Sequence, residues 1–430
     1  MTQRHFILAA PFFPPMGSSG VQRSAKLAKY TQRAGWTPRV LTMSKPPTRQ
    51  YPTDPILGKE VAHLDVQRLP RFDLRLGSRA VHRLGMHALA TRLEWLIPMD
   101  GFAGWTPMAI AAAEALLRQN PRPELIYTTS YPFSVHLVGW WLKKRHGIPW
   151  VADFRDPWTT NERYIEYLGL EPVTRWKLWV DRHLETAMVQ AADVITVVVD
   201  QHRQDLIERF GVPPHKVHTI FNGYDEEDFS AFPYPMAPAS DMFRVTFFGR
   251  FFRKLNPGAF LDMLRLFLGR CPQPQSVRFR IVGEGSQWLR DRLDQYGDMA
   301  EHFELMDYVP HAQVPGLMQQ SSVLLIIFPR PWSITGKIFE YMRSGLPVLG
   351  LAPCHQTQME QMLAEVGTGT VVLSEDIEAG AAALQTFFEA WQGQRRWPTA
   401  PSLEAVTSYS RQAQAGRFME LFEEAVSTTS

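Results

Sequence analysis

The sequence predicts an α/β protein made of two doubly wound parallel sheets in tandem. Short apolar runs alternate with helical patterns along both halves of the chain, which is typical of parallel βαβ units. At 430 residues the chain is too long for one typical hydrophobic core. A Pro/Ala-rich stretch, AFPYPMAPAS, separates the two series. We therefore expect a first domain over residues 1–230, a linker at 231–240 and a second domain over 241–405.

In the first half, a Gly/Ser loop at residues 17–20 leads from the first expected strand into a helix over 21–34. The apolar runs expected as strands lie at residues 6–11, 39–42, 125–129, 150–153 and 194–199. Ligands bind at the carboxyl ends of parallel strands, so the residues that directly follow these runs are candidates for a site.

The second half repeats the pattern and ends with a helix. Its expected strands lie at residues 243–248, 279–282, 303–305, 323–328, 347–350 and 370–373. The final helix, at about residues 408–426, has one apolar face formed by Ala413, Phe418, Leu421, Phe422 and Ala425. Such a face indicates that the helix packs on another part of the chain.

The composition is that of an ordinary globular protein, with 45% apolar and 20% charged residues. The net charge of +2 gives no global signal for nucleic-acid binding. Cys271 and Cys354 form neither a disulfide framework nor a metal-like cluster, and they suit a reducing compartment. No apolar run approaches the roughly 18 residues of a membrane span, and the run at 5–10 is a strand and not a signal peptide. We expect a cytoplasmic protein without a metal site.

The most informative stretch is residues 333–350, SITGKIFEYMRSGLPVLG. We expect Thr335 to cap a helix, and Gly336 to let a ligand approach the free amides of its first turn. Lys337 adds a cation, and Glu340 adds a carboxylate one turn later. Amides and ammonium suit a diphosphate, and a carboxylate suits ribose hydroxyls. On spacing alone, an ordinary helix start with a surface Lys and Glu explains the pattern equally well.

Two further loops carry glycines where a ligand could meet the backbone. The loop at residues 14–23 contains Gly17 and Gly20 and matches neither a dinucleotide-binding nor an ATP-binding motif, so a phosphate or sugar contact and a plain tight turn both remain open. After the expected strand at 243–248, Gly249 is followed by Arg250 and Lys254, which suit a diphosphate or form a solvated surface pair. Arg253 is the alternative to Lys254.

Residues 150–158, WVADFRDPW, place Asp153, Arg155 and Asp156 at the end of an expected strand. The position favours a site at the carboxyl edge of the sheet. A structural salt bridge between arginine and aspartate is the alternative. His136, upstream, is expected to be a core histidine.

These motifs resemble glycosyltransferase family 4, the "group 1" family, and in particular a bacterial branch with Asp-x-Arg-Asp-x-Trp and Gly-Lys-x-Phe-Glu-Tyr sequences. The resemblance runs from about residue 12 to the C-terminal tail. It implies a GT-B fold, in which two Rossmann-like domains face each other across a cleft and a C-terminal helix, here 406–430, crosses back to the first domain. The second domain would hold a nucleotide sugar and the first an acceptor.

The resemblance also implies residue roles. Arg250, Lys254 and Lys337 would clasp the donor diphosphate, and Glu340 the ribose. Backbone at Ser333, Thr335 and Gly336 would meet the donor, with Gly249, Gly283 and Val309 nearby and Gly17 and Gly20 in the cleft. Arg155 and Asp156 would contact the acceptor or the sugar. The implied reaction retains the anomeric configuration and uses neither metal nor cofactor; the donor would be UDP-linked, with GDP as the second choice.

One departure from the family pattern concerns the donor sugar. Many members carry a second glutamate, separated by seven intervening residues from the position of Glu340, and this chain has Trp332 there. Two other interpretations therefore stay open. One is a catalytically silent GT-B protein that binds a nucleotide sugar, which Trp332 favours. The other is a GT-B nucleotide-sugar epimerase, which would need a cluster of acids and histidines in the cleft.

A last pattern concerns the membrane. Arginines recur at four-residue spacing, with leucines interleaved, at Arg71, Arg75, Arg79 and Arg83. A helix with this pattern would have a basic stripe beside an apolar face, as on membrane-surface helices, or would be a solvated helix over the domain. On the first interpretation the enzyme acts on a polyprenyl-linked or glycan acceptor at the inner face of the cytoplasmic membrane, in surface polysaccharide synthesis.

Overall fold

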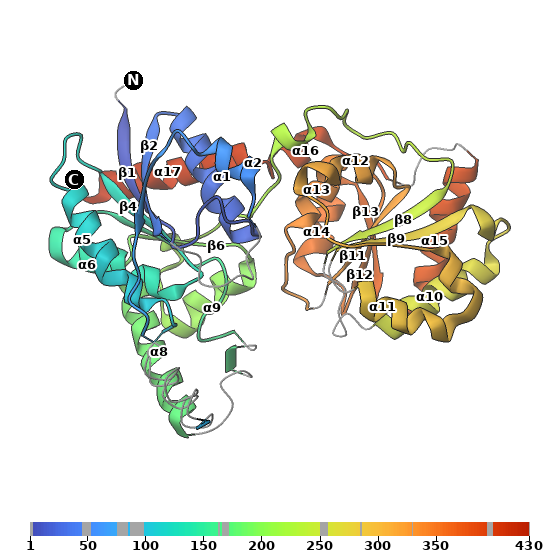
Figure 1. Cartoon of the computed structure of the whole chain (residues 1–430), viewed down its shortest axis with the longest axis horizontal. Helices are drawn as coiled ribbons and strands as arrows, with labels where there is room; N and C mark the ends of the chain where they lie inside the picture. The colour runs from blue at the N-terminus through green and yellow to red at the C-terminus, as the bar shows by residue number, and fades with distance from the viewer. Residues whose placement is uncertain are drawn as a thin grey trace. The chain divides into compact units, whose positions relative to one another are not determined.

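The computed structural model describes residues 3–44, 53–74, 85–86, 99–161, 164–165, 172–249, 257–283, 286–328, 330–393 and 399–429. The chain forms two compact units (Figure 1). The first comprises Met1–Phe221 together with Gln414–Ser430, and the second comprises Asn222–Ala413. Residues 231–240, expected as a linker, lie within the second unit. The amides of Met236 and Ala239 donate hydrogen bonds to the carbonyls of Ser344 and Gln319, which ties this stretch to the second unit.

The first unit has a seven-stranded sheet in the order β3-β2-β1-β4-β5-β6-β7, with every pair parallel. Its strands are β1 (Arg4–Ala9), β2 (Trp36–Met43), β3 (Asp65–Leu69), β4 (Leu125–Thr129), β5 (Trp150–Asp153), β6 (Val194–Val197) and β7 (Val217–Thr219). The strand order reverses between β1 and β4, and ligands of open α/β sheets bind at such a reversal. β3 and β7, the two edge strands, were not predicted. Their sequences, DVQRL and VHT, contain polar as well as apolar residues and form no apolar run.

Helices cover both faces of this sheet, as the βαβ pattern requires. The helices of the first unit are α1 (Ser19–Arg33), α2 (Pro55–Glu60), α5 (Thr106–Leu116), α6 (His136–His146), α8 (Pro172–Ala191) and α9 (Asp200–Phe210), with the short turns η1 (Ala103–Trp105), η2 (Phe133–Val135) and η3 (Pro214–Lys216). The last helix, α17 (Arg411–Thr429), begins in the second unit and belongs to the first from Gln414 onward.

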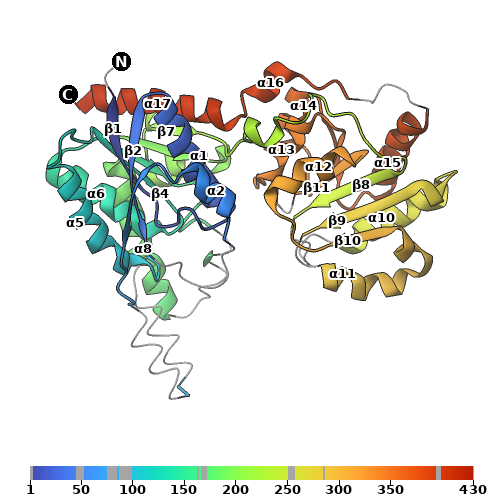
Figure 2. The ribbon, with the colours of Figure 1, turned by 45° about the horizontal axis from the view of Figure 1, so that its top comes forward.

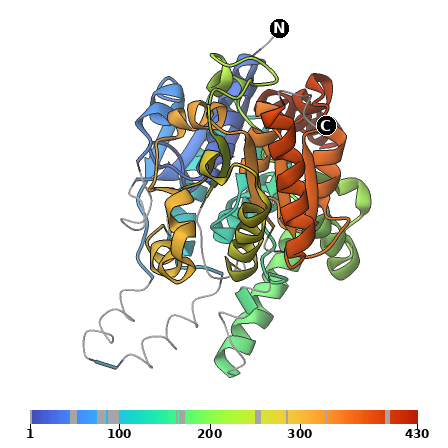
Figure 3. The ribbon, with the colours of Figure 1, turned by 90° about the vertical axis from the view of Figure 1, so that its right-hand side faces the viewer.

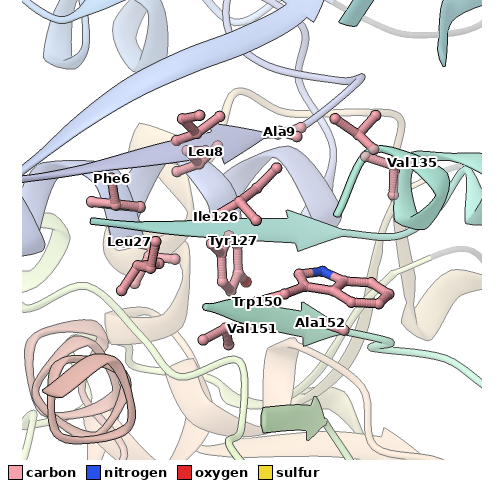
Figure 4. Packing of buried hydrophobic residues seen from close by; sticks show 14 of the residues in the cluster. Phe6, Leu8, Ala9, Leu27, Ile126, Tyr127, Val135, Trp150, Val151 and Ala152 are labelled. Carbon is pink, nitrogen blue, oxygen red and sulfur yellow. The ribbon is translucent and has the colours of Figure 1, made fainter. Parts of the chain in front are cut away.

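The core of the first unit lies between its sheet and helices, and α17 is part of it. Phe6, Tyr127 and Trp150 are fully buried, on the three neighbouring strands β1, β4 and β5 (Figure 4). From α17, Phe418 packs edge-on against Tyr127 at 5.5 Å between ring centroids, and Phe422 lies 5.1 Å from Phe6. The apolar face expected on the final helix thus closes the core of the first unit.

The second unit has a six-stranded parallel sheet in the order β10-β9-β8-β11-β12-β13 (Figure 2). Its strands are β8 (Phe243–Phe248), β9 (Val277–Val282), β10 (Phe303–Met306), β11 (Val323–Ile327), β12 (Val348–Ala352) and β13 (Gly369–Leu373). Counted within the unit, this is the 3-2-1-4-5-6 order of a Rossmann fold. The predicted fold class, two doubly wound parallel α/β domains, is confirmed.

The helices of the second unit are α10 (Pro257–Arg270), α11 (Ser286–Leu293), α12 (Val314–Gln319), α13 (Lys337–Ser344), α14 (Gln358–Val366), α15 (Ile377–Gln392) and α16 (Leu403–Thr407), with the turns η4 (Glu226–Phe229), η6 (Pro274–Ser276), η7 (Asp294–His302) and η8 (His311–Gln313). Aromatic rings dominate the core. Phe243 packs against Phe267 and Phe388 at 6.0 and 5.3 Å between centroids. In the part of the chain that the structure describes, no helix is long and apolar enough to span a membrane.

Candidate functional site

The second unit contains a cavity of about 340 Å³ at the carboxyl ends of β8 and β9. Residues at the carboxyl ends of β8 and β9 and just after β10 line it, and the start of α13 contributes Lys337. The lining consists of Phe248, Gly249, Val282, Gly283, Tyr308, Val309, His311, Val314 and Lys337. Of the residues predicted from sequence, Gly249, Gly283, Val309 and Lys337 therefore lie together around one cavity.

Gly283 shapes this cavity, because only glycine fits there. Its φ is +139°, and a Cβ at this position would lie 2.3 Å from the carbonyl oxygen of Gly249. The loops after β8 and β9 therefore approach each other with bare backbone. Gly249 and Gly283 therefore bring backbone without side chains to the edge of the cavity.

Three ionisable side chains meet beside the cavity. Nζ of Lys337 donates to Oε2 of Glu340 at 2.7 Å, and Nε2 of His311 lies 3.2 Å from Oε1 of the same carboxylate. On its other side, Nδ1 of His311 lies 3.7 Å from Oδ2 of Asp228. Sequence reasoning named Lys337 and Glu340 but missed His311, whose partners are far away in sequence.

The charges of this cluster stabilise one another. Burial raises the pKa of Glu340, but Lys337 and the hydrogen bond from His311 outweigh burial and lower it to about 2. The hydrogen bond to Glu340 raises the pKa of His311 against the effect of burial, and Asp228 raises it further. Both oxygens of Glu340 are thus held, one by the ammonium of Lys337 and the other by the imidazole of His311, and Lys337 also lines the cavity.

The start of α13 differs from the prediction. Gly336 is the N-cap residue, and no side chain caps the helix. Oγ1 of Thr335 is buried and has no hydrogen-bond partner among the described residues, so the prediction that Thr335 caps the helix is wrong. Gly336 has helical dihedral angles of −60° and −25°, and the hydroxyl of the preceding Thr335 does not reach a free amide of the first turn.

Other predicted donor residues lie outside this cavity lining. Ser333, Thr335 and Gly336 are half-buried and precede Lys337 without lining the cavity themselves. The guanidinium of Arg330 lies 5.3 Å from the ring of Trp332, the residue that departs from the family pattern. Arg250, Arg253 and Lys254 lie outside the described residues.

The first unit has a cavity of about 120 Å³ where the strand order reverses, between the ends of β1 and β4 and the start of α1. It is lined by Ala10, Pro11, Phe12, Ser18, Gly20, Val21, Ser24, Thr129, Tyr131 and Arg155. A Cβ at Gly20 would lie 2.2 Å from Nη1 of Arg155, so a larger residue there would displace the end of this side chain. The predicted residues Gly20 and Arg155 therefore meet in this cavity, whereas Gly17 is not part of its lining.

Asp153 is the centre of a buried polar network, but it does not pair with Arg155. Its carboxylate accepts two hydrogen bonds from Arg23 on α1, both at 2.9 Å. Further hydrogen bonds come from the hydroxyls of Tyr127, Thr129 and Thr196. Burial raises the pKa of Asp153, but Arg23 outweighs burial and lowers it. Asp153 therefore has a structural role, and sequence reasoning missed its partner Arg23.

Arg155 is left facing the cavity. Its Nε is buried without a hydrogen-bond partner in the described part of the chain, and burial lowers the pKa of the guanidinium. A cation in this state favours an anionic or hydroxyl-bearing ligand over empty space. The neighbouring Asp156 is exposed and does not line the cavity. Arg155 and Asp156, which were predicted to act together, therefore lie in different places: Arg155 lines the cavity and Asp156 lies outside its lining.

His136 lies in the core of the first unit, as expected. Its Nδ1 lies 2.9 Å from Oγ1 of Thr128, and its ring stacks on Phe154 at 4.0 Å between centroids. Burial lowers the pKa of His136 to about 3, so the ring is neutral at physiological pH. A neutral and fully buried ring has no access to a substrate.

Comparison with protein families finds glycosyltransferase families in both halves of the chain. The family described as Glycosyltransferase Family 4 matches residues 19–228. The family described as Glycosyl transferases group 1 matches residues 243–390. The chain therefore contains matches to both halves of such an enzyme. No curated protein sequence matches the chain.

Solved structures share the fold over nearly the whole chain. HepE from Anabaena in complex with UDP aligns with a TM-score of 0.64 and 14% identity, covering 98% of this chain and 100% of that one. A glycosyltransferase from Rickettsia africae gives 0.62 and 13%, covering 99% of both chains. Sucrose-phosphate synthase from Thermosynechococcus elongatus gives 0.60 and 16%, covering 99% of this chain and 100% of that one. At such identities the likeness concerns the fold.

Proposed function

The chain belongs to the glycosyltransferases of family 4 and group 1, and from this premise we propose that it transfers a sugar from a UDP-sugar to a glycan or lipid-linked acceptor. The observation that supports this proposal best is the cavity of the second unit, where bare backbone, Lys337 and His311 converge at the carboxyl ends of parallel strands. UDP is favoured over GDP because the HepE structures contain UDP or UDP-glucose.

In the proposed mechanism the protein stabilises the departing nucleoside diphosphate. Lys337 gives up Glu340 and binds the diphosphate, with Arg250 and Lys254 as the expected partners, while the backbone around Gly249 and Gly283 lies along the nucleotide. Such preorganised charges act where negative charge develops on the leaving group. The resemblance to family 4 implies retention of configuration without metal or cofactor, with a leaving phosphate oxygen taking the acceptor proton.

Glu340 has the second role in this scheme. Once Lys337 moves to the diphosphate, Oε2 of Glu340 becomes free to accept a hydrogen bond from a ribose hydroxyl. His311 still holds Oε1 and keeps the carboxylate charged. On donor binding, the diphosphate thus replaces Glu340 as the partner of Lys337, and a ribose hydroxyl replaces Lys337 as the partner of Glu340. Little charge pairing is lost in this exchange.

We propose that the acceptor binds in the first unit. We propose that Arg155 contacts the acceptor or the transferred sugar in the cavity beside Gly20, and that Asp156 acts from the surface next to it. For the pathway we propose surface polysaccharide synthesis on a polyprenyl-linked acceptor at the inner face of the cytoplasmic membrane. Arg71 of the arginine stripe is described, and Arg75, Arg79 and Arg83 lie outside the described residues.

The first test is which nucleoside diphosphate stabilises the protein. At a hundred times its dissociation constant a ligand adds about 2.7 kcal/mol to the free energy of unfolding, which a thermal shift detects. We expect UDP to give the largest shift, followed by GDP. If no nucleoside diphosphate or nucleotide sugar raises the melting temperature, the donor site is wrong.

Turnover separates the proposal from its two rivals. A panel of UDP- and GDP-sugars with lipid-linked and soluble glycan acceptors should release the nucleoside diphosphate only when an acceptor is present. A silent binding protein, which Trp332 favours, would show the thermal shift without turnover. An epimerase would convert the nucleotide sugar in the absence of acceptor.

A further inference from the structure

Helix α8 of the first unit has an exposed face rich in tryptophan and arginine. The side chains of Trp176 and Trp179 are 45% and 59% exposed, which is unusual for so large an apolar group. Arg175, Arg182 and His183 are exposed on the same side of the helix, since each of them, like Trp176, lies three or four positions from Trp179. We call this group of five residues the α8 face.

The opposite side of α8 fixes the helix in the domain. Asp181 and Glu185 are fully buried there. Nζ of Lys177 donates to Asp181 at 2.9 Å and to the carbonyl of Met99 at 3.0 Å, and the amide of Thr159 donates to Glu185 at 3.1 Å. Both acidic residues of the helix are therefore buried and hydrogen-bonded within the domain, and the α8 face contains only neutral or basic side chains.

Other exposed apolar residues lie at the same end of the unit. Met99, which α8 binds, leads into the turn at 103–105, where the carbonyl of Gly104 accepts from the amide of Phe72 at 3.1 Å. Phe72 and Leu74 are 61% and 45% exposed, and the guanidinium of Arg71 lies over the ring of Phe102 at 5.1 Å. Figure 3 shows α8 projecting beyond the sheet of its unit.

We propose that the α8 face docks the first unit on an anionic lipid bilayer. Tryptophan rings settle at the boundary between head groups and acyl chains, and arginines beside them pair with acidic head groups. The absence of any carboxylate on this face of the helix makes it complementary to a negative surface and leaves no acidic group to repel it. Commitment to a bilayer also rests on the proposed function, in which the acceptor is lipid-linked.

The two kinds of side chain contribute differently. Each arginine close to an anionic surface strengthens binding about fivefold, so the two arginines alone give roughly 25-fold at low salt. That contribution is lost at about 1 M salt, where the Debye length falls to about 3 Å. Insertion of the tryptophans is apolar and insensitive to salt. Binding of the α8 face to a bilayer should therefore have two separable contributions, one from the arginines that is sensitive to salt and one from the tryptophans that is not.

The test is sedimentation of the full chain with vesicles of phosphatidylcholine, with and without phosphatidylglycerol. The variant Trp176→Ser/Trp179→Ser should lose binding at least tenfold at every salt concentration. The variant Arg175→Gln/Arg182→Gln should lose roughly 25-fold at low salt and little at high salt. The matched control is Trp141→Ser on α6, since Trp141 is 44% exposed, donates to Glu114 at 3.1 Å and lies outside the α8 face. It should bind as the wild type does.

Brominated lipids give a second readout. They should quench part of the tryptophan fluorescence in the wild type and in the Trp141→Ser variant, and none in the double tryptophan variant. Three results would overturn the proposal. The wild type ignores anionic vesicles at low salt, the double tryptophan variant binds as well as the control, or that variant changes the oligomeric state and so identifies a second copy as the occupant.

Vesicle binding and the proposed reaction are measured separately. The α8 variants should keep the wild-type thermal shift with the nucleoside diphosphate and the wild-type turnover of a soluble acceptor. A chain that docks on vesicles but neither binds nor turns over a nucleotide sugar contradicts the proposed function and leaves the docking surface standing.

Discussion

The cavities of the two units both lie at the carboxyl ends of parallel strands, but their charges are arranged in opposite ways. In the second unit the cation that faces the cavity, Lys337, is paired with Glu340 on the same helix. In the first unit the buried carboxylate of Asp153 is paired with Arg23, and Arg155 faces the cavity without a hydrogen bond from its Nε among the described residues. Proximity in sequence indicates which charges share a strand end, but it does not indicate which of them pair.

The comparison also separates exchangeable from permanent pairs. Lys337 and Glu340 are three residues apart at the edge of a cavity, and their side chains are 29% and 14% exposed. Arg23 and Asp153 are 130 residues apart, and their side chains are 3% and 0% exposed. A ligand could replace the first pair at low cost, whereas nothing could replace the second without leaving a buried charge unpaired. The four predictions that follow, ordered from the largest expected effect to the smallest, test this difference.

Arg23→Met should destabilise the fold by about 3–5 kcal/mol, because it leaves the buried carboxylate of Asp153 without its cation. Chemical denaturation measures the effect. The pKa of Asp153 is lowered in the folded state, so the pair stabilises the fold above the ordinary pKa of an aspartate, near 4. That stabilisation is lost as the pH falls through the folded pKa, and the destabilisation by the variant should shrink accordingly. A loss below about 1 kcal/mol at neutral pH would show that this pair is as replaceable as a surface pair.

Lys337→Ala should reduce turnover by roughly a hundredfold, by analogy with the loss of one donor that stabilises a transition-state anion. The free energy of unfolding should fall less than in Arg23→Met, because the Lys337–Glu340 pair is partly exposed and His311 still contacts the carboxylate. Initial rates with saturating acceptor measure the effect. Lys144→Ala on α6 is the matched control, since Lys144 is an exposed lysine in the other unit. Near wild-type rates in Lys337→Ala would remove this residue from the donor site.

Glu340→Gln should weaken binding of the nucleoside diphosphate by about 1.5–3 kcal/mol, the range for hydrogen bonds to a charged group. Titration calorimetry measures the change. Because the pKa of Glu340 is lowered to about 2, its charge stabilises the fold above about pH 4.5 and is lost between about pH 4.5 and 2. The variant should not show that part of the acid transition. Unchanged nucleotide affinity would leave Glu340 with a purely structural role.

His311→Gln should remove a pH dependence from donor binding. The pKa of His311 is raised, so its charge supports Glu340 at low pH, and that support is lost as the pH rises through the folded pKa. Affinity of the wild type should fall about two- to fivefold as the histidine deprotonates, the range for a partly exposed ion pair. UDP-glucose is the suitable probe, because its phosphates do not titrate in this range. A flat profile in the wild type, or an equal slope in the variant, would contradict the role of His311.

The sequence was sufficient to predict the fold because apolar strands leave a local signal. Runs such as those at residues 125–129 and 243–248 coincide with β4 and β8, and polar edge strands such as β3 were missed for lack of it. The partners Arg23 and His311 could not be predicted, because each meets its carboxylate across a distance in sequence at which no motif is visible. Thr335 was misassigned because its residue type fits a helix cap, but its hydroxyl is buried and makes no capping hydrogen bond. The roles of Ser333 and Gly336 stay predictions.

The position of α17 has a consequence for how the protein folds during its synthesis on the ribosome. The first unit needs Phe418 and Phe422 to cover Phe6 and Tyr127, yet these rings are translated after the whole second unit. Until α17 is synthesised, the apolar surface around Phe6 and Tyr127 stays exposed. Exposed apolar surface of this kind aggregates with other chains or binds a chaperone. An N-terminal fragment ending at residue 221 should aggregate, and a synthetic peptide of residues 411–429 added in trans should rescue its solubility. The first unit is therefore complete only after the second unit has been synthesised.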